Sequence, residues 1–221
     1  MAEPFATRFE ELPGEIPIFP LTGVLLLPRG KLPLNIFEPR YLAMVSDALA
    51  PPRLIGMIQP QEGKGDTGEP ATYPIGCAGR IVSFGETEDG RYLITLTGVA
   101  RFELREELPL RRGYRRVRVD WARFERDLAA PETPADVDRK RLLAALKPYF
   151  QRRGIGADWD AVNGMADEPL VAMLAMGCPF APSEKQALLE ADGLAARATL
   201  LTALFEMEAA PAAPEQTTLR H

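Results

Sequence analysis

Few residues of this chain are of the types that carry out nucleophilic or acid–base catalysis. His221, the last of 221 residues, is the only histidine, so no histidine is available inside the chain as the base of a serine or cysteine triad. The only serines are Ser46, Ser83 and Ser183, and a helix surface, a strand and a helix cap explain them. The sequence therefore predicts no catalytic residue.

Patterns that bind metals or nucleotides are equally weak. Acidic residues cluster at 86–89, 136–138 and 158–160, but a hairpin tip and helix caps explain these clusters, and no histidine accompanies them. Residues 63–68 match Gly-x-Gly-x-x-Gly, the spacing of a dinucleotide-binding turn. The segment that follows, Glu69–Pro74, contains two prolines and cannot begin the helix that a pyrophosphate needs. We therefore predict no metal site and no cofactor.

A basic run between Arg111 and Arg126 is the strongest charge feature. It holds seven arginines against Asp120 and Glu125, a local charge of +5 in a chain whose net charge is −5. Basic residues interleaved with aromatic residues are typical of RNA-binding surfaces. The candidate nucleic-acid-binding residues are Arg115, Arg116 and Arg118. The pattern also fits the solvated outer face of an edge strand, where charge prevents unwanted strand pairing, and we favour this structural interpretation.

A second candidate site is an apolar segment near the N-terminus. Prolines interrupt it at Pro17, Pro20, Pro28, Pro33 and Pro39, which is typical of short strands at the edge or rim of a sheet. Not all of its apolar side chains can point inward, so we predict that some receive extended or unfolded polypeptide segments. The candidate polypeptide-binding residues are Leu25, Leu26, Leu27, Pro28, Leu32 and Pro33. The alternative is that these leucines fill one end of a barrel beneath a helix that begins at Pro39.

The overall composition is that of a soluble globular protein, with 46% hydrophobic and 26% charged residues. The net charge of −5 argues against a protein dedicated to polyanions. No run reaches the roughly 18 apolar residues that cross a bilayer, and the start lacks the pattern of a signal peptide. We expect a cytoplasmic protein that does not enter a membrane. Cys77 and Cys178 are expected to be buried thiols.

Strands are predicted to fill the first half of the chain. They lie at 53–59, 76–84, 91–97, 99–108 and 115–121, with one early helix that begins at Pro39. In the hairpin, alternation places Ile81 with Ser83 on one face and Val82 with Phe84 on the other. Alternation in the last strand directs Val117, Val119 and Trp121 inward.

Helical patterns fill the second half, so the blocks indicate an α+β fold. Capping boxes are predicted at Thr133 with Asp136 and at Ser183 with Gln186. The composition changes near residues 129–134, where we place a subdomain boundary. We predict a β subdomain at 14–128, a helical subdomain at 133–208, and flexible ends at 1–13 and 211–221.

Several of these segments resemble one known family. Phe-Pro-Leu within Ile16–Leu21, an apolar run ending in proline at Val24–Pro28, and Pro-Leu-x-Ile-Phe-Glu-Pro-Arg-Tyr within Leu32–Tyr41 resemble the start of the N-terminal substrate-binding domain of ATP-dependent Lon proteases. Further segments resemble the same family, namely Gly76–Ile81, Leu96–Phe102, Gln186–Glu190 and Arg197. The resemblance implies a PUA-like β pseudobarrel that carries one early helix and is followed by an α-helical bundle.

The resemblance also implies a function. It suggests a non-catalytic module that recognises unfolded or damaged polypeptide, as an adaptor in protein quality control with a protease or chaperone partner. The chain contains no Gly-x-x-x-x-Gly-Lys-Ser/Thr phosphate loop and no domain for a Ser-Lys peptidase dyad, so we expect neither ATP hydrolysis nor peptide cleavage. Two alternatives remain open: an RNA-binding PUA-like module that uses the Arg111–Arg126 strand, and a protein–protein scaffold without a ligand. The oligomeric state also remains open.

Overall fold

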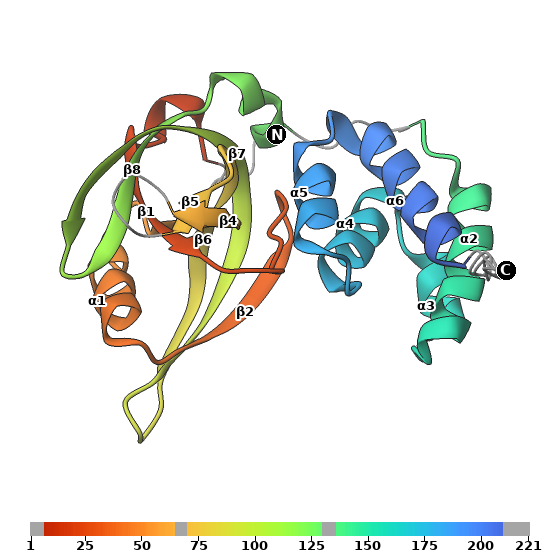
Figure 1. Cartoon of the computed structure of the whole chain (residues 1–221), viewed down its shortest axis with the longest axis horizontal. Coiled ribbons are helices and arrows are strands. Elements are labelled where there is room, and N and C mark those ends of the chain that lie inside the picture. Colours follow the sequence, from red (N-terminus) through yellow and green to blue (C-terminus); the bar gives the residue numbers. More distant parts are fainter. Residues whose placement is uncertain (1–6, 65–69, 130–135, 210–221) are drawn as a thin grey trace, which may run out of the picture. The chain divides into compact units, whose positions relative to one another are not determined.

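The computed structural model has a mixed α+β architecture, as the sequence predicts (Figure 1). It describes residues 7–64, 70–129 and 136–209, so the predicted flexible ends lie largely outside the described residues. Contacts between residues divide the chain into two compact units. The strand unit is Met1–Thr133 with Ala172–Glu190, and the helical unit is Pro134–Val171 with Ala191–His221. The division into a β subdomain at 14–128 and a helical subdomain at 133–208 stays a prediction.

Six strands of the strand unit form one sheet that nearly closes on itself. They are β1 (Glu15–Pro20), β2 (Lys31–Ile36), β3 (Leu54–Ile58), β6 (Ile75–Glu86), β7 (Tyr92–Arg111) and β8 (Tyr114–Asp120). Their order is β2-β7-β6-β3-β1-β8, and a further pairing of β7 with β8 joins all of them except β2 into a ring. β1 and β3 are parallel, and the other pairs are antiparallel. Two short strands, β4 (Pro60–Lys64) and β5 (Pro70–Thr72), pair separately.

Alternate side chains of these strands fill a common core. Its buried members are Ile16, Ile18, Ile58, Ala78, Ala100, Phe102, Val117, Val119 and Trp121. The predicted inward positions in β8 and at Trp121 are therefore confirmed. The indole Nε1 of Trp121 donates to the carbonyl oxygen of Pro13 at 2.9 Å, which satisfies the one polar group of this buried ring.

Residues 92–111 form a single strand, although the sequence predicts two strands separated at Gly98. The Gly98 N–H donates to the carbonyl oxygen of Gly30 at 2.9 Å, and its own carbonyl accepts from the N–H of Arg29 at 2.8 Å. A Cβ at position 98 would collide with the carbonyl oxygen of Leu27. Gly98 is therefore explained by a close approach of two backbone segments, and not by a turn.

Helix α1 (Pro39–Ala48) begins at a proline, as predicted, and lies against the ring of strands (Figure 1). Its buried residues are Tyr41, Met44, Val45 and Ala48. The ring centroid of Tyr41 lies 4.2 Å from that of Phe19 in β1. Aromatic contact therefore fixes α1 against β1.

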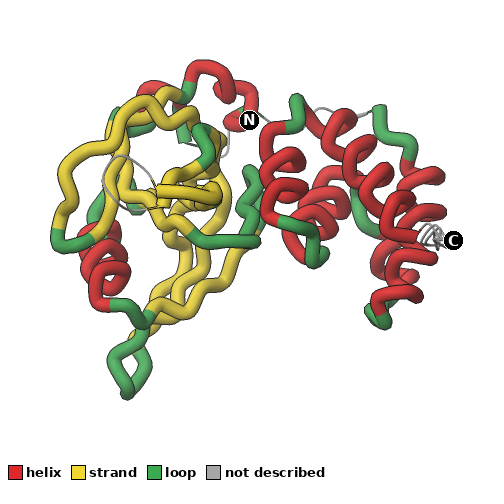
Figure 2. The backbone as a smooth tube through the Cα atoms, in the orientation of Figure 1, coloured by secondary structure: helices red, strands yellow, loops and turns green. Residues whose placement is uncertain are grey.

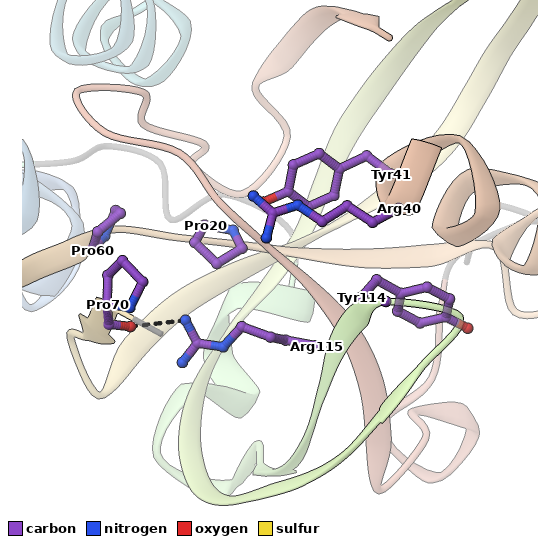
Figure 3. Close-up of a pocket in the computed structure, with 8 residues that line it drawn as sticks. Pro20, Arg40, Tyr41, Pro60, Pro70, Tyr114 and Arg115 are labelled. Carbon is purple, nitrogen blue, oxygen red and sulfur yellow. Dashed lines mark hydrogen bonds between the residues drawn. The ribbon is translucent and has the colours of Figure 1, made fainter. Parts of the chain in front are cut away.

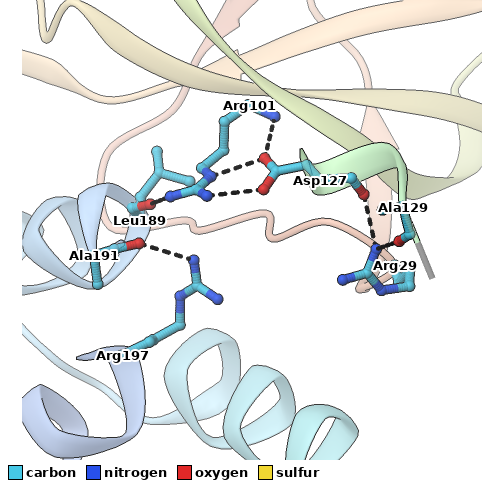
Figure 4. Close-up of polar contacts among 7 residues, drawn as sticks. All are labelled: Arg29, Arg101, Asp127, Ala129, Leu189, Ala191 and Arg197. Atoms are coloured by element: carbon cyan, nitrogen blue, oxygen red, sulfur yellow. Dashed lines mark hydrogen bonds and ion pairs between the residues drawn. The ribbon is translucent and has the colours of Figure 1, made fainter. Parts of the chain in front are cut away.

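Helix α5 (Pro182–Glu190) and the end of α4 (Asp167–Gly177) also belong to the strand unit. Arg101 of β7 donates from Nε and Nη2 to the Asp127 carboxylate, each at 2.8 Å, and from Nη1 to the carbonyl oxygen of Leu189 at 3.0 Å (Figure 4). Gln186 Nε2 donates to the carbonyl oxygen of Ile75 at 3.1 Å. Two segments that resemble the Lon family, 96–102 and 186–190, therefore contribute contacts that attach α5 to the strands.

The helical unit contains α2 (Arg139–Arg153), α3 (Trp159–Gly164), the start of α4 and α6 (Gly193–Ala209). The rings of Tyr149 in α2 and Phe205 in α6 lie 4.7 Å apart. Arg197 Nη2 donates to the carbonyl oxygen of Ala191 at 3.5 Å within α6 and the residues before it (Figure 4). Short 3-10 turns occur at η1 (Phe9–Glu11) and η2 (Ala122–Leu128) in the strand unit.

The predicted capping box at Thr133 with Asp136 falls partly outside the described residues, because Thr133 is not described. Helix α2 begins at Arg139, where the Asp138 carboxylate accepts from the N–H of Arg141 at 3.0 Å. The predicted capping box at Ser183 with Gln186 is wrong in position. Helix α5 begins at Pro182, and the Glu184 carboxylate accepts from the N–H of Ala181 at 2.7 Å. At the start of each of these helices an acidic side chain, Asp138 or Glu184, satisfies a backbone N–H group.

Candidate functional site

Most of the predicted polypeptide-binding residues lie inside the strand unit. Leu25, Leu26 and Leu27 are 2%, 1% and 1% exposed, and Pro28 is also buried. Leu32 is half-buried, and Pro33 is exposed on β2. The burial favours the alternative interpretation, in which the three leucines fill the interior. Polypeptide binding at residues 25–33 stays a prediction, and only Leu32 and Pro33 have the exposure that it requires.

Exposed apolar side chains gather instead where β6 and β7 project beyond the ring. β3 pairs with β6 only as far as Arg80. Beyond that residue, β6 and β7 continue as a hairpin, and β2 pairs with the other edge of β7 (Figures 1 and 2). We call this three-stranded part, residues 31–36 and 81–97, the hairpin extension. Of the seven large apolar side chains that are exposed among the described residues, Val82, Phe84 and Leu93 lie on it and Phe37 directly follows it.

The hairpin extension has one covered face and one open face. Ile94 and Ile36 are buried on the covered face, and the Tyr92 hydroxyl lies 3.4 Å from Ser46 Oγ of α1. Leu93 lies on the open face, where its cross-strand partners are Gly85 of β6 and Asn35 of β2. Val82 is 54% exposed and Leu93 is 49% exposed. Solvent therefore contacts apolar groups on a sheet surface that is ordinarily polar.

Sequence alternation missed this arrangement because it assumed a regular strand. A register shift between Ile81 and Ser83 inserts one extra residue into β6. Ile81 and Ser83 therefore fall on opposite faces, since Ile81 pairs with Leu96 and Ser83 pairs with Thr95. The predicted common face of Ile81 and Ser83 is wrong.

A small pocket of about 100 Å³ lies between α1, β8 and the β4–β5 pair (Figure 3). Its lining residues are Pro20, Arg40, Tyr41, Pro60, Pro70, Gly113, Tyr114 and Arg115. Arg115 donates to the carbonyl oxygen of Pro70 at 2.9 Å and pairs with Glu107, and the Arg40 guanidinium lies 4.6 Å from the centre of the Tyr41 ring. Prolines, aromatic rings and two guanidinium groups thus surround a space of only a few water molecules.

The arginines of β8 lie beside carboxylates from neighbouring elements. Arg115 is buried and pairs with Glu107 of β7, whereas Arg116 lies 3.7 Å from Glu15 of β1. Arg118 pairs with Glu106 and also lies 3.6 Å from Glu15. This pairing supports the structural interpretation of the basic run, because adjacent strands offset its charge. RNA binding by Arg115, Arg116 and Arg118 stays a prediction.

A polar contact joins α1 to β8 near the same pocket. The Tyr114 hydroxyl donates to Asp47 Oδ2 at 2.7 Å, and Arg112 Nη1 lies 2.7 Å from Asp47 Oδ1. Burial, followed by the hydrogen bond to Asp47, raises the pKa of Tyr114 to about 12. The same hydrogen bond is the largest cause that holds the pKa of Asp47 below its ordinary value. Both shifts favour a neutral tyrosine beside an ionised carboxylate.

Other kinds of site find little support in the part of the chain that the structure describes. There, no three histidine, cysteine or acidic side chains come together in a way that would hold a metal ion. Cys77 and Cys178 are buried thiols, as predicted. No helix within the described ranges has the length and apolar character needed to cross a bilayer.

Comparison with known families and sequences gives one consistent result. The family model described as the ATP-dependent protease La (LON) substrate-binding domain matches residues 15–206. Lon protease 2 of Myxococcus xanthus is 28% identical over 210 residues, which are 93% of this chain and 25% of that protein. Lon protease of Parabacteroides distasonis is 33% identical over 105 residues, which are 47% of this chain and 13% of that protein. The chain therefore spans at most about a quarter of the length of these relatives.

Solved structures with the same fold include two Lon N-terminal domains. A Lon N-terminal domain protein from Xanthomonas campestris gives a TM-score of 0.58 at 23% identity, covering 86% of this chain and 97% of that chain. The N-terminal domain of the Mycobacterium avium complex Lon protease gives a TM-score of 0.57 at 17% identity, with the same coverage of both chains. These likenesses show that the fold is shared.

Proposed function

Because this chain belongs to the family of the ATP-dependent protease La (LON) substrate-binding domain, we propose that it is a non-catalytic module that binds unfolded or damaged polypeptide. In this proposal it acts in the cytoplasm as an adaptor in protein quality control, and presents bound segments to a protease or chaperone partner. The observation that carries the proposal is the group of exposed apolar side chains on the hairpin extension.

The chemistry of this surface fits an unfolded polypeptide. Folded proteins bury most of their large apolar side chains, whereas unfolded segments expose them, so exposed apolar groups discriminate between the two states. Val82 and Leu93 offer such groups on a narrow sheet that reaches away from the ring (Figure 2). Removal of about 40 Å² of apolar surface from water at each contact is worth about 1 kcal/mol. Several such contacts give useful affinity without any specific sequence.

Of the predicted residues, the proposed site keeps Pro33 of β2 within the hairpin extension, whereas Leu32 pairs with Leu96 and lies on the covered face. Pro33 is exposed and pairs with Thr95, two residues from Leu93 on the same open face. The proposed site does not include the predicted residues at 25–28, because these residues are buried and leave no surface for a ligand.

Fluorescence anisotropy tests the proposal. The probe is a fluorescein-labelled polypeptide that carboxymethylation of its cysteines keeps unfolded, titrated with this protein. We expect saturable binding that is insensitive to salt, and the double variant Val82→Ser/Leu93→Ser should weaken it by about tenfold. Met207→Ser is the matched control, since Met207 is an exposed apolar residue of the helical unit. Equal affinities of the double variant and this control would contradict the proposed site.

A labelled single-stranded RNA is titrated in parallel at two salt concentrations. Binding of RNA alone, with an affinity that falls as salt rises, would replace this proposal by the nucleic-acid alternative. Absence of binding to either probe would favour a protein–protein scaffold without such ligands.

A further inference from the structure

We propose that the free edge of β6 at residues 82–86 receives an extended polypeptide segment as an additional strand. The segment that fits has an apolar residue two positions from a lysine or arginine. This inference rests on the proposed function, because it assigns the mode of binding and the class of segment. It concerns backbone groups and one charge, and not only the apolar side chains considered above.

The edge is open because β6 outruns its neighbour. β3 pairs with β6 up to Arg80, and the N–H of Ile81 then donates to the carbonyl oxygen of Arg53 at 2.9 Å. From Val82 to Glu86, β6 pairs with β7 on one side, and no described strand pairs with it on the other. An unpaired strand edge presents donors and acceptors that another strand can use.

The direction of each backbone group follows from the hydrogen bonds at the two ends of the hairpin. The N–H of Thr87 donates to the carbonyl oxygen of Arg91 at 2.9 Å. The backbone N–H and C=O groups of odd-numbered residues in this part of β6 therefore point toward β7. On the opposite side of β7, the backbone of Gly98 forms hydrogen bonds with Gly30 and Arg29. The backbone N–H and C=O groups of even-numbered residues in this part of β7 therefore point toward β2. The N–H and C=O groups of Phe84 and Glu86 therefore point away from β7, to the open edge.

The side chains at this edge define which segment fits. Phe84 and Glu86 lie on the same face because they are two residues apart in a strand. An incoming strand would set an apolar residue opposite Phe84 and a basic residue opposite Glu86. Gly85, between them, faces the other side, and a Cβ there would have no atom within 4 Å. The middle residue of the segment can therefore be of almost any size.

Charge at the hairpin tip agrees with a basic segment. Asp89 pairs with Arg91 at 2.8 Å, which leaves no net charge from these two residues. Glu86 and Glu88 have no ion-pair partner among the residues that the structure describes. The tip thus carries two uncompensated carboxylates beside an apolar edge, and a lysine or arginine in the bound strand complements them.

The opposite edge of the extension does not offer the same groups. In β2 the backbone groups of Gly30 and of the even-numbered residues point toward β7. The backbone groups that point outward are therefore those of Lys31, Pro33 and Asn35. Pro33 has no N–H to donate, and the charge of Lys31 opposes pairing with another strand. The β6 edge has neither a proline nor a lysine.

Amide hydrogen exchange, followed by NMR, tests the inference directly. The probe is a fluorescein-labelled peptide, Gly-Ser-Lys-Thr-Val-Thr-Lys-Ser-Gly, whose symmetric core presents the same pattern in parallel and antiparallel orientations. At saturation, exchange of the Phe84 and Glu86 amides should slow by about tenfold or more. The Gly85 amide faces β7 and should exchange equally with and without peptide.

A charge exchange gives the second measurement. Glu86→Lys should weaken binding of the lysine peptide by about fivefold, and a peptide with glutamate in place of both lysines should bind this variant better than the original protein. Glu125→Lys is the control for net charge, because Glu125 lies exposed on η2. Equal loss in both variants would overturn the pairing with Glu86.

The outcomes separate this inference from the proposed function. Binding of the carboxymethylated polypeptide with unchanged exchange at Phe84 and Glu86 would overturn the edge inference and leave the proposed function in place. Failure of both the polypeptide and the peptide to bind would overturn both. Protection of the two amides without any peptide, together with a dimer in sedimentation, would assign the edge to a second copy of the chain.

Discussion

Replacement of Arg101 by methionine should strongly destabilise the strand unit. The Arg101 and Asp127 side chains are 6% and 10% exposed and form a bidentate ion pair. The same guanidinium donates to Leu189 at the end of α5 and lies 4.4 Å from the centre of the Phe124 ring. Methionine keeps most of the apolar volume but leaves the Asp127 carboxylate buried without its main partner.

The expected cost is about 3–5 kcal/mol, because one member of a buried ion pair is left uncompensated. Urea unfolding measures this cost as a change in the free energy of unfolding. Trp121 belongs to the strand unit and Trp159 to the helical unit, so a Trp159→Phe background makes tryptophan fluorescence report on the strand unit alone. Hydrogen exchange in α5 should also accelerate, since the contact to Leu189 is lost.

Two controls decide whether burial of the charge is the cause. Arg105 pairs with Glu103 and Asp120 but is half exposed, so Arg105→Met should lower the free energy of unfolding far less than Arg101→Met does. The double variant Arg101→Met/Asp127→Leu should recover much of the loss, because it buries no lone carboxylate. A loss below 1 kcal/mol for Arg101→Met, or an equal loss in the double variant, would refute the reasoning.

Three further perturbations test the fold around the site. Tyr114→Phe should lower the free energy of unfolding by about 1–2 kcal/mol at neutral pH. Because the pKa of Tyr114 is raised from 10.0 to about 12, the stability that its hydroxyl contributes is complete below pH 10.0 and is lost as pH rises through 12. In unfolding curves, the difference in stability between the two proteins should therefore shrink over that pH range. Leu27→Ala should cost about 2–5 kcal/mol in urea unfolding, as expected of a core residue, without changing the affinity of the folded fraction for unfolded polypeptide. Gly98→Ala should lower the free energy of unfolding by about 1–3 kcal/mol, and the melting temperature with it, because the new methyl group collides with the carbonyl oxygen of Leu27. Gly85→Ala should change the free energy of unfolding by less than about 0.5 kcal/mol.

Local sequence patterns predicted the α+β fold, the helix that begins at Pro39 and the inward side chains of β8. Each of these depends on neighbours within a few residues, such as a proline at the first helical position or a strict two-residue alternation. The burial of Leu25, Leu26 and Leu27 depends on which strands close the ring, which no local pattern records. The sequence therefore identified an apolar segment but left open whether its leucines are exposed or fill the end of a barrel.

The charge of β8 illustrates the same limit. Its arginines are contiguous in sequence, but the carboxylates beside them come from Glu15 of β1 and from Glu106 and Glu107 of β7. A window along the chain therefore counts a positive strand where the folded sheet has interleaved charges. The β-bulge at 81–83 escapes detection for a related reason, since the extra residue is defined only by the register of β6 against β7.

The residues that resemble the Lon family act mainly within the fold. Arg101 and Gln186 bond to backbone carbonyls that join α5 to the strands, and Tyr41 packs on Phe19. The large exposed apolar residues of the hairpin extension, Val82, Phe84 and Leu93, lie outside the segments that resemble the family, whereas Pro33 lies within one of them. The resemblance therefore accounts mainly for the scaffold. In the proposed function, the choice of bound segment depends on side chains outside the resembling segments, such as Phe84 and Glu86 at the β6 edge.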